Sequence, residues 1–323
     1  MASSSQNSGL VINLLQGDKR ALAKAISLVE NDEDSSSDLL NEIYLKLGRG
    51  YRIGITGPPG AGKSTLVDQL TKEFRKQRKG VGIVAVDPTS PFTGGALLGD
   101  RVRMSEIAMD EGVYIRSMAT RGSVGGLSKK ADDVADILDA FGNDYIILET
   151  VGVGQSELDI AESADTTVVV LVPESGDSVQ AMKAGLMEIA DLFVLNKADR
   201  AGADQAFTEI QSMLELSNKK DWRPPILKSV ANQGEGIAEI IETIAEHRDF
   251  QSQQNLLEKK RKQRLFKKIK SIVRFRFEQA FWDETAYKTI DETLESYRNL
   301  KMSPYKIADE LIENFKRKLE RKE

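Results

Sequence analysis

Cysteine is absent from this chain, and histidine occurs only once, at position 247. The lack of cysteine excludes disulfide bonds, thiolate metal sites and cysteine nucleophiles together, and it fits a reducing cytoplasm. Long apolar runs are missing too, since none reaches the roughly 18 residues of a membrane-spanning helix. The serine-rich residues 1–10 lack the arginines and the apolar segment of a targeting signal, so we expect a frayed terminus there.

An excess of positive charge is also missing. The formal net charge is −5 over 323 residues, which argues against bulk binding of nucleic acid. With 40% apolar and 29% charged residues, the composition is that of an ordinary globular protein. A chain of this length can bury a large core, and we expect one domain of about 200 residues with helical extensions.

The periodicity of apolar residues divides the chain into three regions. Residues 1–48 form an N-terminal region with helical spacing over residues 10–47, interrupted by an acidic and serine-rich stretch at 31–37 and ending at Gly48, which we expect to cap a helix. Residues 49–248 alternate short, β-branched apolar runs with longer helical stretches, which is typical of parallel strands covered by helices. Residues 249–323 carry no strand signal and are helical and heavily charged. We predict an α/β fold with a mostly parallel sheet, helices on both of its faces, an N-terminal helical extension and a helical C-terminal arm. The predicted strands are YRIGIT, VGIVAV, VYIRSM, YIILET, TTVVVLV, LFVLN and PPILKSV.

A glycine-rich loop follows the first predicted strand. Residues 57–64, GPPGAGKS, match the pattern G-x-x-x-x-G-K-[ST] at every position and precede the amphipathic stretch STLVDQLTKEFRKQ. Glycines let backbone N–H groups converge on phosphate oxygens, and the helix N-terminus favours negative charge. Lys63 is expected to reach the β- and γ-phosphates, and the Ser64 hydroxyl to ligate Mg²⁺. This pattern predicts a P-loop nucleotide site formed by Gly57, Pro59, Gly60, Ala61, Gly62, Lys63, Ser64 and Thr65.

The base of the nucleotide is indicated by residues 196–199, NKAD, at the end of the run LFVLN. A carboxylate at Asp199 can accept hydrogen bonds from N1–H and the exocyclic amine of guanine. Adenine offers neither donor, and an unpaired buried acceptor costs roughly 1–3 kcal/mol. Lys197 can lie along the purine face, and Asn196 can tie this loop to the phosphate loop. We therefore predict GTP rather than ATP.

A second base-contacting loop is predicted after the last strand. It contains Ser229, Val230 and Ala231, and the Ala231 N–H is expected to face O6 of guanine.

Acidic residues at strand ends are the candidate metal ligands. Glu149 ends the run YIILET and occupies the Walker B position, with Gly152 three residues later to sense the γ-phosphate. Asp87, at the end of VGIVAV, and Asp100, in the loop that follows it, are further candidates, directly or through water. The alternatives are that Asp87 is a turn residue before a proline and that Asp100 caps a helix.

The residue that orients water in Ras-like GTPases has no counterpart at its usual position, which is Val153 here, and Gln155 is displaced by two residues. We therefore expect slow intrinsic hydrolysis. Lys183 could bring positive charge to the phosphates when a partner orders its segment. Its rivals, each of which could equally be a solvated surface charge, are Arg101, Arg103 and Arg121. The candidate catalytic residues are Lys63, Asp100 and Lys183.

The sequence resembles the MeaB/ArgK-type GTPases, the group associated with methylmalonyl-CoA mutase, over roughly residues 15–245. The matching stretches are GDKRALAKAISLVEN, GPPGAGKST, AVDPTSPFTGGALLGDRVRM, RSMATRGSVGGLS, ETVGVGQSE, SGDSVQAMKAG and LNKAD. This resemblance implies a GTP- and Mg²⁺-dependent homodimer of the signal-recognition and nickel-insertion branch. It also implies a protein that gates the delivery of adenosylcobalamin to an acyl-CoA mutase and protects that mutase. One departure is residues 229–231, which read Ser-Val-Ala where Thr-Ser-Ala is usual.

The C-terminal arm repeats apolar residues at helical spacing between basic ones, most densely at residues 259–270. We interpret it as a helix with a solvated face that packs against a second subunit. The alternative is a docking surface for an acidic partner. Aromatic residues that we expect to form a helix–helix core are Phe275, Phe277, Phe281 and Trp282.

Three other functions stay open, and one of them is a passive switch that binds GTP and hydrolyses it only when docked. A nickel-inserting GTPase of the same branch would need cysteine and histidine to carry metal, and we expect His247 at a helix surface. A small-molecule kinase would need a lid and Arg–Lys clusters, but it would not need the NKAD loop. We predict no nucleic-acid or membrane partner.

Overall fold

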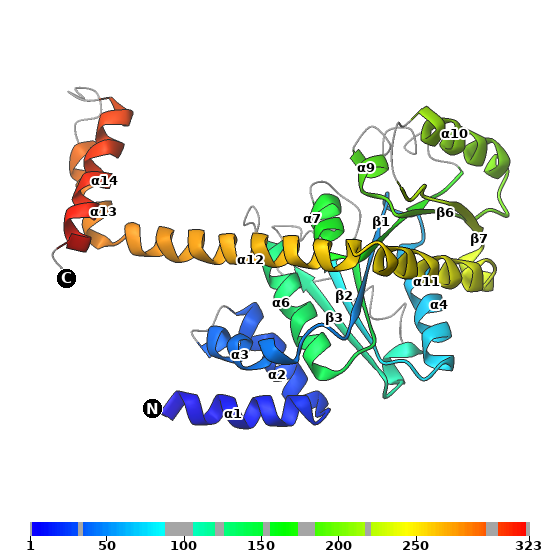
Figure 1. Ribbon diagram of the computed structural model, residues 1–323, viewed down its shortest axis with the longest axis horizontal. Helices are drawn as coiled ribbons and strands as arrows, with labels where there is room; N and C mark the ends of the chain where they lie inside the picture. The colour runs from blue at the N-terminus through cyan, green and yellow to red at the C-terminus, as the bar shows by residue number, and fades with distance from the viewer. Residues whose placement is uncertain are drawn as a thin grey trace. The chain divides into compact units, whose positions relative to one another are not determined.

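The computed structural model describes residues 2–31, 35–87, 106–119, 126–150, 156–173, 185–216, 221–294 and 303–320. The chain forms two compact units, Met1–Arg261 and Lys262–Glu323. The first unit holds a sheet with helices around it, and the described part of the second consists of helices (Figure 1). None of the described helices combines the length and apolar character that crossing a membrane requires.

The N-terminal extension consists of three helices, α1 (Ala2–Leu15), α2 (Lys19–Glu30) and α3 (Ser35–Ile43), followed by the 3₁₀ turn η1 (Tyr44–Lys46). Helix α1 occupies the residues expected to be frayed. The expected helical stretch breaks at Gly17, whose φ is +87°, because Asp18 caps α2 by accepting a hydrogen bond from the Arg20 N–H at 2.7 Å. The serines at 35–37 begin α3 rather than interrupting a helix.

The sheet has seven strands in the order β3-β2-β4-β1-β5-β6-β7, and every pair of neighbours is parallel. Each strand contains residues of one predicted run, so the predicted fold class is confirmed. The central strand β1 is buried along its whole length. The bounds are β1 Tyr51–Thr56, β2 Val81–Asp87, β3 Val113–Ala119, β4 Tyr145–Thr150, β5 Thr166–Leu171, β6 Leu192–Asn196 and β7 Ile226–Ser229.

Helices cover both faces of the sheet. On one face, α4 (Lys63–Lys76) and α11 (Ile237–Gln253) pack against a core that contains Ile147 of β4. On the other face, α6 (Gly126–Phe141) and α7 (Ser156–Ser163) share a core with Ile146 and Leu148. This alternation along β4 follows from the two-residue period of a strand. Other described elements of this unit are η2 (Ile107–Met109), α9 (Met187–Ile189), α10 (Ala203–Leu216) and η4 (Ala231–Gln233).

The three N-terminal helices form a further layer over α6. Their buried residues, including Leu22 and Ile26 of α2, belong to the same core as Leu138 of α6. An ion pair also joins this layer to the sheet, because Arg116 on β3 pairs with Glu30 at the end of α2.

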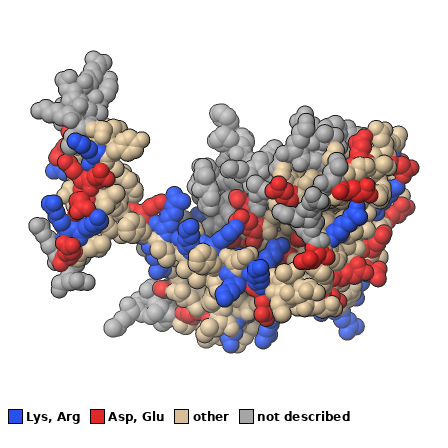
Figure 2. Space-filling model, turned by 45° about the horizontal axis from the view of Figure 1, so that its top comes forward, with Lys and Arg blue, Asp and Glu red and all other residues tan. Residues whose placement is uncertain are grey.

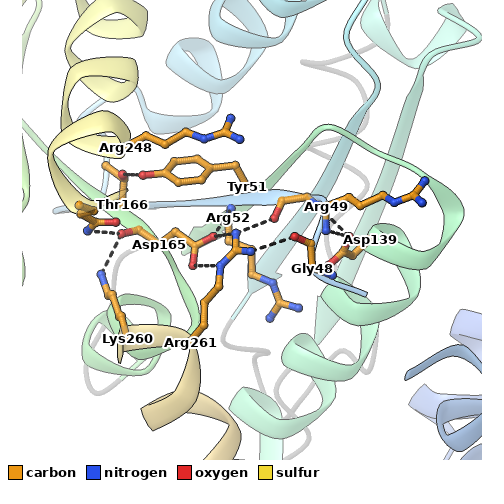
Figure 3. A network of polar contacts seen from close by, with 12 residues as sticks. Gly48, Arg49, Tyr51, Arg52, Asp139, Asp165, Thr166, Arg248, Lys260 and Arg261 are labelled. Carbon is orange, nitrogen blue, oxygen red and sulfur yellow. Dashed lines mark hydrogen bonds and ion pairs between the residues drawn. The ribbon is translucent and has the colours of Figure 1, made fainter. Parts of the chain in front are cut away.

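A polar cluster closes the end of the sheet where β1 and β5 begin (Figure 3). Asp165, directly before β5, has no exposed surface, and its carboxylate accepts hydrogen bonds from the Arg52 N–H at 3.0 Å and from Arg261 Nη2 at 2.7 Å. Its carbonyl accepts from Gln251 of α11 and from Lys260 of α12 (Leu256–Phe281), each at 3.0 Å. The last residues of the first unit are thus bonded to the start of the sheet.

The segment that leads into β1 is held from two sides. Asp139 of α6 accepts hydrogen bonds from the N–H groups of Gly48, Arg49 and Gly50, at 2.7, 3.1 and 2.8 Å. Arg261 donates to the carbonyls of Gly48 and Gly50, each at 3.0 Å. Gly48, expected as a helix cap, therefore serves as part of this junction.

His247 is buried, which corrects its expected position at a helix surface. Its Nδ1 lies 2.8 Å from the Thr166 hydroxyl, and its ring stacks at a tilt on Trp222 with 4.9 Å between centroids. The Thr166 hydroxyl also bonds the Tyr51 hydroxyl at 2.6 Å, and burial raises the pKa of that tyrosine. The histidine is therefore a hydrogen-bonded core residue on the face of α11 that packs against the sheet.

The second unit contains the rest of α12 together with α13 (Glu284–Leu294) and α14 (Pro304–Glu320). Phe281 contacts Phe277, Trp282 and Phe315, with ring centroids 6.4, 5.0 and 5.1 Å apart. The predicted aromatic residues thus contact one another in part, but they do not form a buried core, because Phe275, Phe277 and Trp282 are all exposed. Basic and acidic side chains are interspersed over this unit, with uncharged surface between them (Figure 2).

Candidate functional site

The predicted phosphate loop joins β1 to α4. Gly57, Gly60 and Gly62 all have positive φ, at +137°, +74° and +86°. A Cβ at Gly57 would lie 2.1 Å from the carbonyl oxygen of Val170, and one at Gly62 would lie 2.4 Å from Asn196 Nδ2. Both positions therefore require glycine, the first because β5 passes so close and the second because the base loop does.

The remaining loop residues divide by exposure. Pro59, Gly60 and Thr65 face solvent, whereas Ala61 is buried beneath the loop. Gly62 caps α4, so the first N–H groups of that helix lie at the loop. This is the arrangement of backbone amides that anions bind at a helix N-terminus.

Lys63 is buried within the curve of this loop. Its ammonium donates to the carbonyls of Gly57 at 2.8 Å and Pro58 at 2.9 Å. These bonds fix the cation between the end of β1 and the start of α4, where it can interact with phosphate oxygens held by the loop amides.

Two side chains that could ligate a metal through oxygen lie next to each other at the start of α4. The Ser64 hydroxyl donates to Oε1 of Glu149 at 2.6 Å, and Glu149 is only 2% exposed. The two residues are 85 positions apart in sequence and are brought together because Ile55 pairs with Glu149 across β1 and β4. Mg²⁺ prefers hard oxygen ligands and commonly takes only one or two from protein, the rest being water and phosphate. A hydroxyl and a carboxylate side by side fit that ion.

Other predicted metal and catalytic residues are placed only in part. The backbone of Asp87 ends β2, which pairs with β4 through Val86 and Thr150. The Asp87 side chain lies outside the described part of the structure. Among the described residues, no three acidic or histidine side chains gather as a metal site. The predicted residues outside the described ranges are Asp100, Arg101, Arg103, Arg121, Gly152, Val153, Gln155 and Lys183.

The NKAD loop is bonded directly to the phosphate loop. Asn196 is buried, and its Nδ2 donates to the carbonyl of Ala61 at 2.8 Å. Lys197 adopts a left-handed φ of +57°, and its ammonium donates to the Gly60 carbonyl at 2.9 Å. Asp199 is exposed at the outer end of the loop, so its carboxylate is accessible to a base.

The second base loop is bonded to the first. Oδ1 of Asn196 accepts hydrogen bonds from the Ser229 hydroxyl and the Ala231 N–H, each at 3.1 Å. The Ala231 N–H, which we expected to face guanine O6, is thus already donated, and a base could only share it. Val230 is buried and exchanges two backbone hydrogen bonds with Glu235, at 3.2 and 3.3 Å. These contacts give residues 229–235 a fixed shape beside the NKAD loop.

One contact near this site was not predicted from the sequence. The hydroxyls of Thr56 and Thr150, at the ends of β1 and β4, lie 3.1 Å apart in the core. Threonine at the end of a strand is unremarkable by itself, so only the strand register could identify this pair.

Comparison with known proteins gives one consistent result. The sequence profile of the family described as "Methylmalonyl Co-A mutase-associated GTPase MeaB" matches residues 22–286. A putative GTPase of Pyrococcus horikoshii is 49% identical over 308 residues, covering 94% of this chain and 96% of its own. The mouse methylmalonic aciduria type A homolog, a mitochondrial protein, is 37% identical over 263 residues, covering 76% and 63%. The crystal structure of a LAO/AO transport system kinase matches with a TM-score of 0.72 and 27% identity, covering 97% and 98%.

Proposed function

The chain belongs to the MeaB family of methylmalonyl-CoA mutase-associated GTPases, and from this premise we propose that it gates the delivery of adenosylcobalamin to an acyl-CoA mutase and protects that mutase. The protein is a GTPase, as members of this family are. The observation that carries the proposal is the family match over residues 22–286, which spans the phosphate loop, strand β4 with Glu149, and both base loops. The mutase role itself is inferred from the family description.

In this proposal the nucleotide lies across the loops at the carboxyl ends of the strands. The amides of residues 57–65 and the Lys63 ammonium hold the phosphates, and Asp199 selects guanine. Asn196 keeps the base loop and the phosphate loop at a fixed separation through its bond to the Ala61 carbonyl. Ser64 and Glu149 would hold Mg²⁺, with Asp87 and Asp100 as further candidate ligands, directly or through water. The ion would neutralise charge on the β- and γ-phosphates.

Hydrolysis in this proposal is slow until a partner docks. Val153 cannot orient water as the glutamine of Ras-like GTPases does. Gly152 senses the γ-phosphate, and Lys183 supplies the positive charge that the transition state requires. The docked mutase would bring the Lys183 charge to the phosphates and so link GTP cleavage to cofactor delivery.

We also propose that the protein is a cytoplasmic homodimer formed through the second unit. Helix α14 exposes Tyr305, Ile312 and Leu319 at seven-residue intervals, and these side chains are 83%, 43% and 52% exposed. Residues spaced by seven lie along one side of a helix. The described α12–α14 residues bury little apolar surface, since Leu311 is their one side chain in the buried class. A second copy would cover this exposed stripe.

The nickel-inserting alternative is not supported. The chain has no cysteine, and its single histidine is bonded in the core beside Thr166. A kinase for small molecules would not need the buried Asn196, whose side chain makes three hydrogen bonds that connect the phosphate loop with the two base loops.

The test is GTP turnover by the purified protein with and without an adenosylcobalamin-dependent acyl-CoA mutase and its cofactor. We expect the mutase to raise turnover by at least about tenfold, because a positive side chain brought to the phosphates accelerates other GTPases by more than this. The Lys63→Ala variant, which should lose phosphate binding, controls for contaminating GTPase. Basal turnover that the mutase leaves unchanged would contradict the chaperone role and leave the GTPase activity standing.

A further inference from the structure

A buried hydrogen bond between two hydroxyls joins the strand of the phosphate loop to the strand of the proposed metal ligand. Oγ1 of Thr150 donates to Oγ1 of Thr56 at 3.1 Å, and neither residue has exposed surface. Thr56 is the last residue of β1, and Thr150 is the last residue of β4. The bond therefore lies at the carboxyl ends of β1 and β4, next to the candidate site.

The two threonines stand one position beyond the last backbone pair of these strands. The register between β1 and β4 ends at Ile55 and Glu149. Strand β4 stays paired with β2 one residue further, through Thr150 and Val86. The hydroxyl bond therefore continues the lateral connection between β1 and β4 at the point where their backbone ladder stops.

Each threonine is covalently next to a residue of the site. Thr56 precedes Gly57, whose carbonyl accepts from the Lys63 ammonium at 2.8 Å. Thr150 follows Glu149, whose carboxylate accepts from the Ser64 hydroxyl at 2.6 Å. The Thr56–Thr150 bond and the Ser64–Glu149 bond thus tie the same two chain segments together at two places.

We propose that Thr56 and Thr150 are positioning residues for GTP hydrolysis. Their bond fixes the separation between the phosphate loop and Glu149 at the ends of the two strands. The inference rests on the proposed role of Glu149 in holding Mg²⁺. A buried hydrogen bond has no water to replace it, and a displacement of about 1 Å at a catalytic site can cost on the order of 100-fold in rate.

Valine in place of threonine removes the hydroxyl and keeps the branched shape, so it isolates the bond. We expect Thr150→Val to lower kcat for GTP by about tenfold. This loss is smaller than the roughly 100-fold loss for a full 1 Å displacement, because the strands remain paired. It should also raise the Mg²⁺ concentration for half-maximal rate several-fold while the Kd for GDP without Mg²⁺ stays within about twofold. Thr150→Ser, which keeps a hydroxyl, should restore both quantities.

Thr56→Val provides the same test from the other strand, and it serves alone if Thr150→Val does not fold. The double variant Thr56→Val/Thr150→Val should be no slower than the slower single variant, because both changes act through one bond. Additive losses in kcat would show that the threonines act separately and would overturn the proposal.

The matched control is Thr71→Val on α4, which is equally buried and whose hydroxyl donates to the Val67 carbonyl at 2.7 Å. It loses a buried hydrogen bond within one helix, so it should lower thermal stability and leave kcat and the Mg²⁺ requirement within about twofold. If Thr150→Val changes the kinetics no more than this control does, the threonines are only core residues and the inference is wrong.

Glu149→Ala separates the two proposals. An unchanged Mg²⁺ requirement in that variant would contradict the metal role of Glu149. A raised requirement in Glu149→Ala together with an unchanged one in Thr150→Val would leave the metal role standing and overturn the positioning role.

Discussion

The guanidinium of Arg261 is bonded to the carboxylate of Asp165, with 2.7 Å between Nη2 and Oδ2, at the residue where the first compact unit ends. Asp165 is fully buried, and the Arg261 side chain is 27% exposed. The same guanidinium reaches the carbonyls of Gly48 and Gly50 before β1. One side chain on α12 thus holds the starts of both β1 and β5.

Arg261→Gln should lower the free energy of unfolding of the first unit by about 2–3 kcal/mol, because it leaves the Asp165 carboxylate buried with fewer partners. The partial exposure of Arg261 keeps the expected loss below that of a fully buried pair. Urea unfolding measures the change. Lys259→Gln, on the exposed side of the same helix, should change stability by less than about 0.5 kcal/mol. Equal losses in the two variants would show that the ion pair contributes nothing specific.

Asp199→Asn should exchange guanine for xanthine as the preferred base. The amide can donate to the O2 of xanthine, whereas it cannot accept both hydrogens that guanine presents. Exchanging two hydrogen bonds to a charged carboxylate for at most one to a neutral amide should weaken GDP binding by about 100-fold and strengthen XDP binding. Isothermal titration with GDP and XDP measures both. Asp221→Asn, another exposed acid, is the control and should leave both affinities unchanged; an unaltered preference in Asp199→Asn would rule out this residue as the base reader.

Asp159→Asn should stabilise the protein at neutral pH but not in acid. Burial, together with the neighbouring carboxylates of Glu162 and Asp132, raises the pKa of Asp159 above its ordinary value. A group whose pKa is raised on folding adds stability below its unfolded pKa of about 3.9 and loses it as pH rises through the folded value.

At pH 7 the charged Asp159 is therefore a cost that asparagine removes. The gain should be about 0.5 kcal/mol, since the half-buried carboxylate is partly screened by solvent. Urea unfolding at pH 7 and pH 4 compares the variant with the parent protein. If the variant is less stable than the parent at pH 7, or gains equally at both pH values, the pKa of Asp159 is not raised by folding.

Ile312→Glu/Leu319→Glu should separate the proposed dimer. Charges on the exposed stripe of α14 would have to be buried against a second copy, which should weaken association by about 30-fold or more, or about 2 kcal/mol. Analytical ultracentrifugation measures the change, and circular dichroism checks that the helices remain. Lys306→Glu, an exposed change on the same helix, should leave association unaffected. A parent protein that sediments as a monomer would refute the dimer itself.

Much of this protein could be predicted from its sequence because the relevant signals are local. Seven β-branched runs, the GPPGAGKS loop and the NKAD loop each need only neighbouring residues to be recognised, and all seven runs are strands. The errors also have local causes. Residues 2–10 contain few helix-specific signals yet form part of α1, and His247 has polar neighbours in sequence yet packs against Trp222.

The sequence by itself determined the strands and the phosphate-loop motif, and it singled out the residues that we predict to read guanine, because backbone conformation and chemical motif are set over a few adjacent positions. Only the tertiary structure decided which of these segments meet. The order of the strands places Glu149 against Ser64, Thr150 against Thr56 and Asn196 against Ala61. Packing also decided that Arg261, the last residue of the first unit, bonds to Asp165 rather than to an acid nearer to it in the sequence. Register and packing depend on contacts between residues far apart in the chain, and no local pattern encodes them.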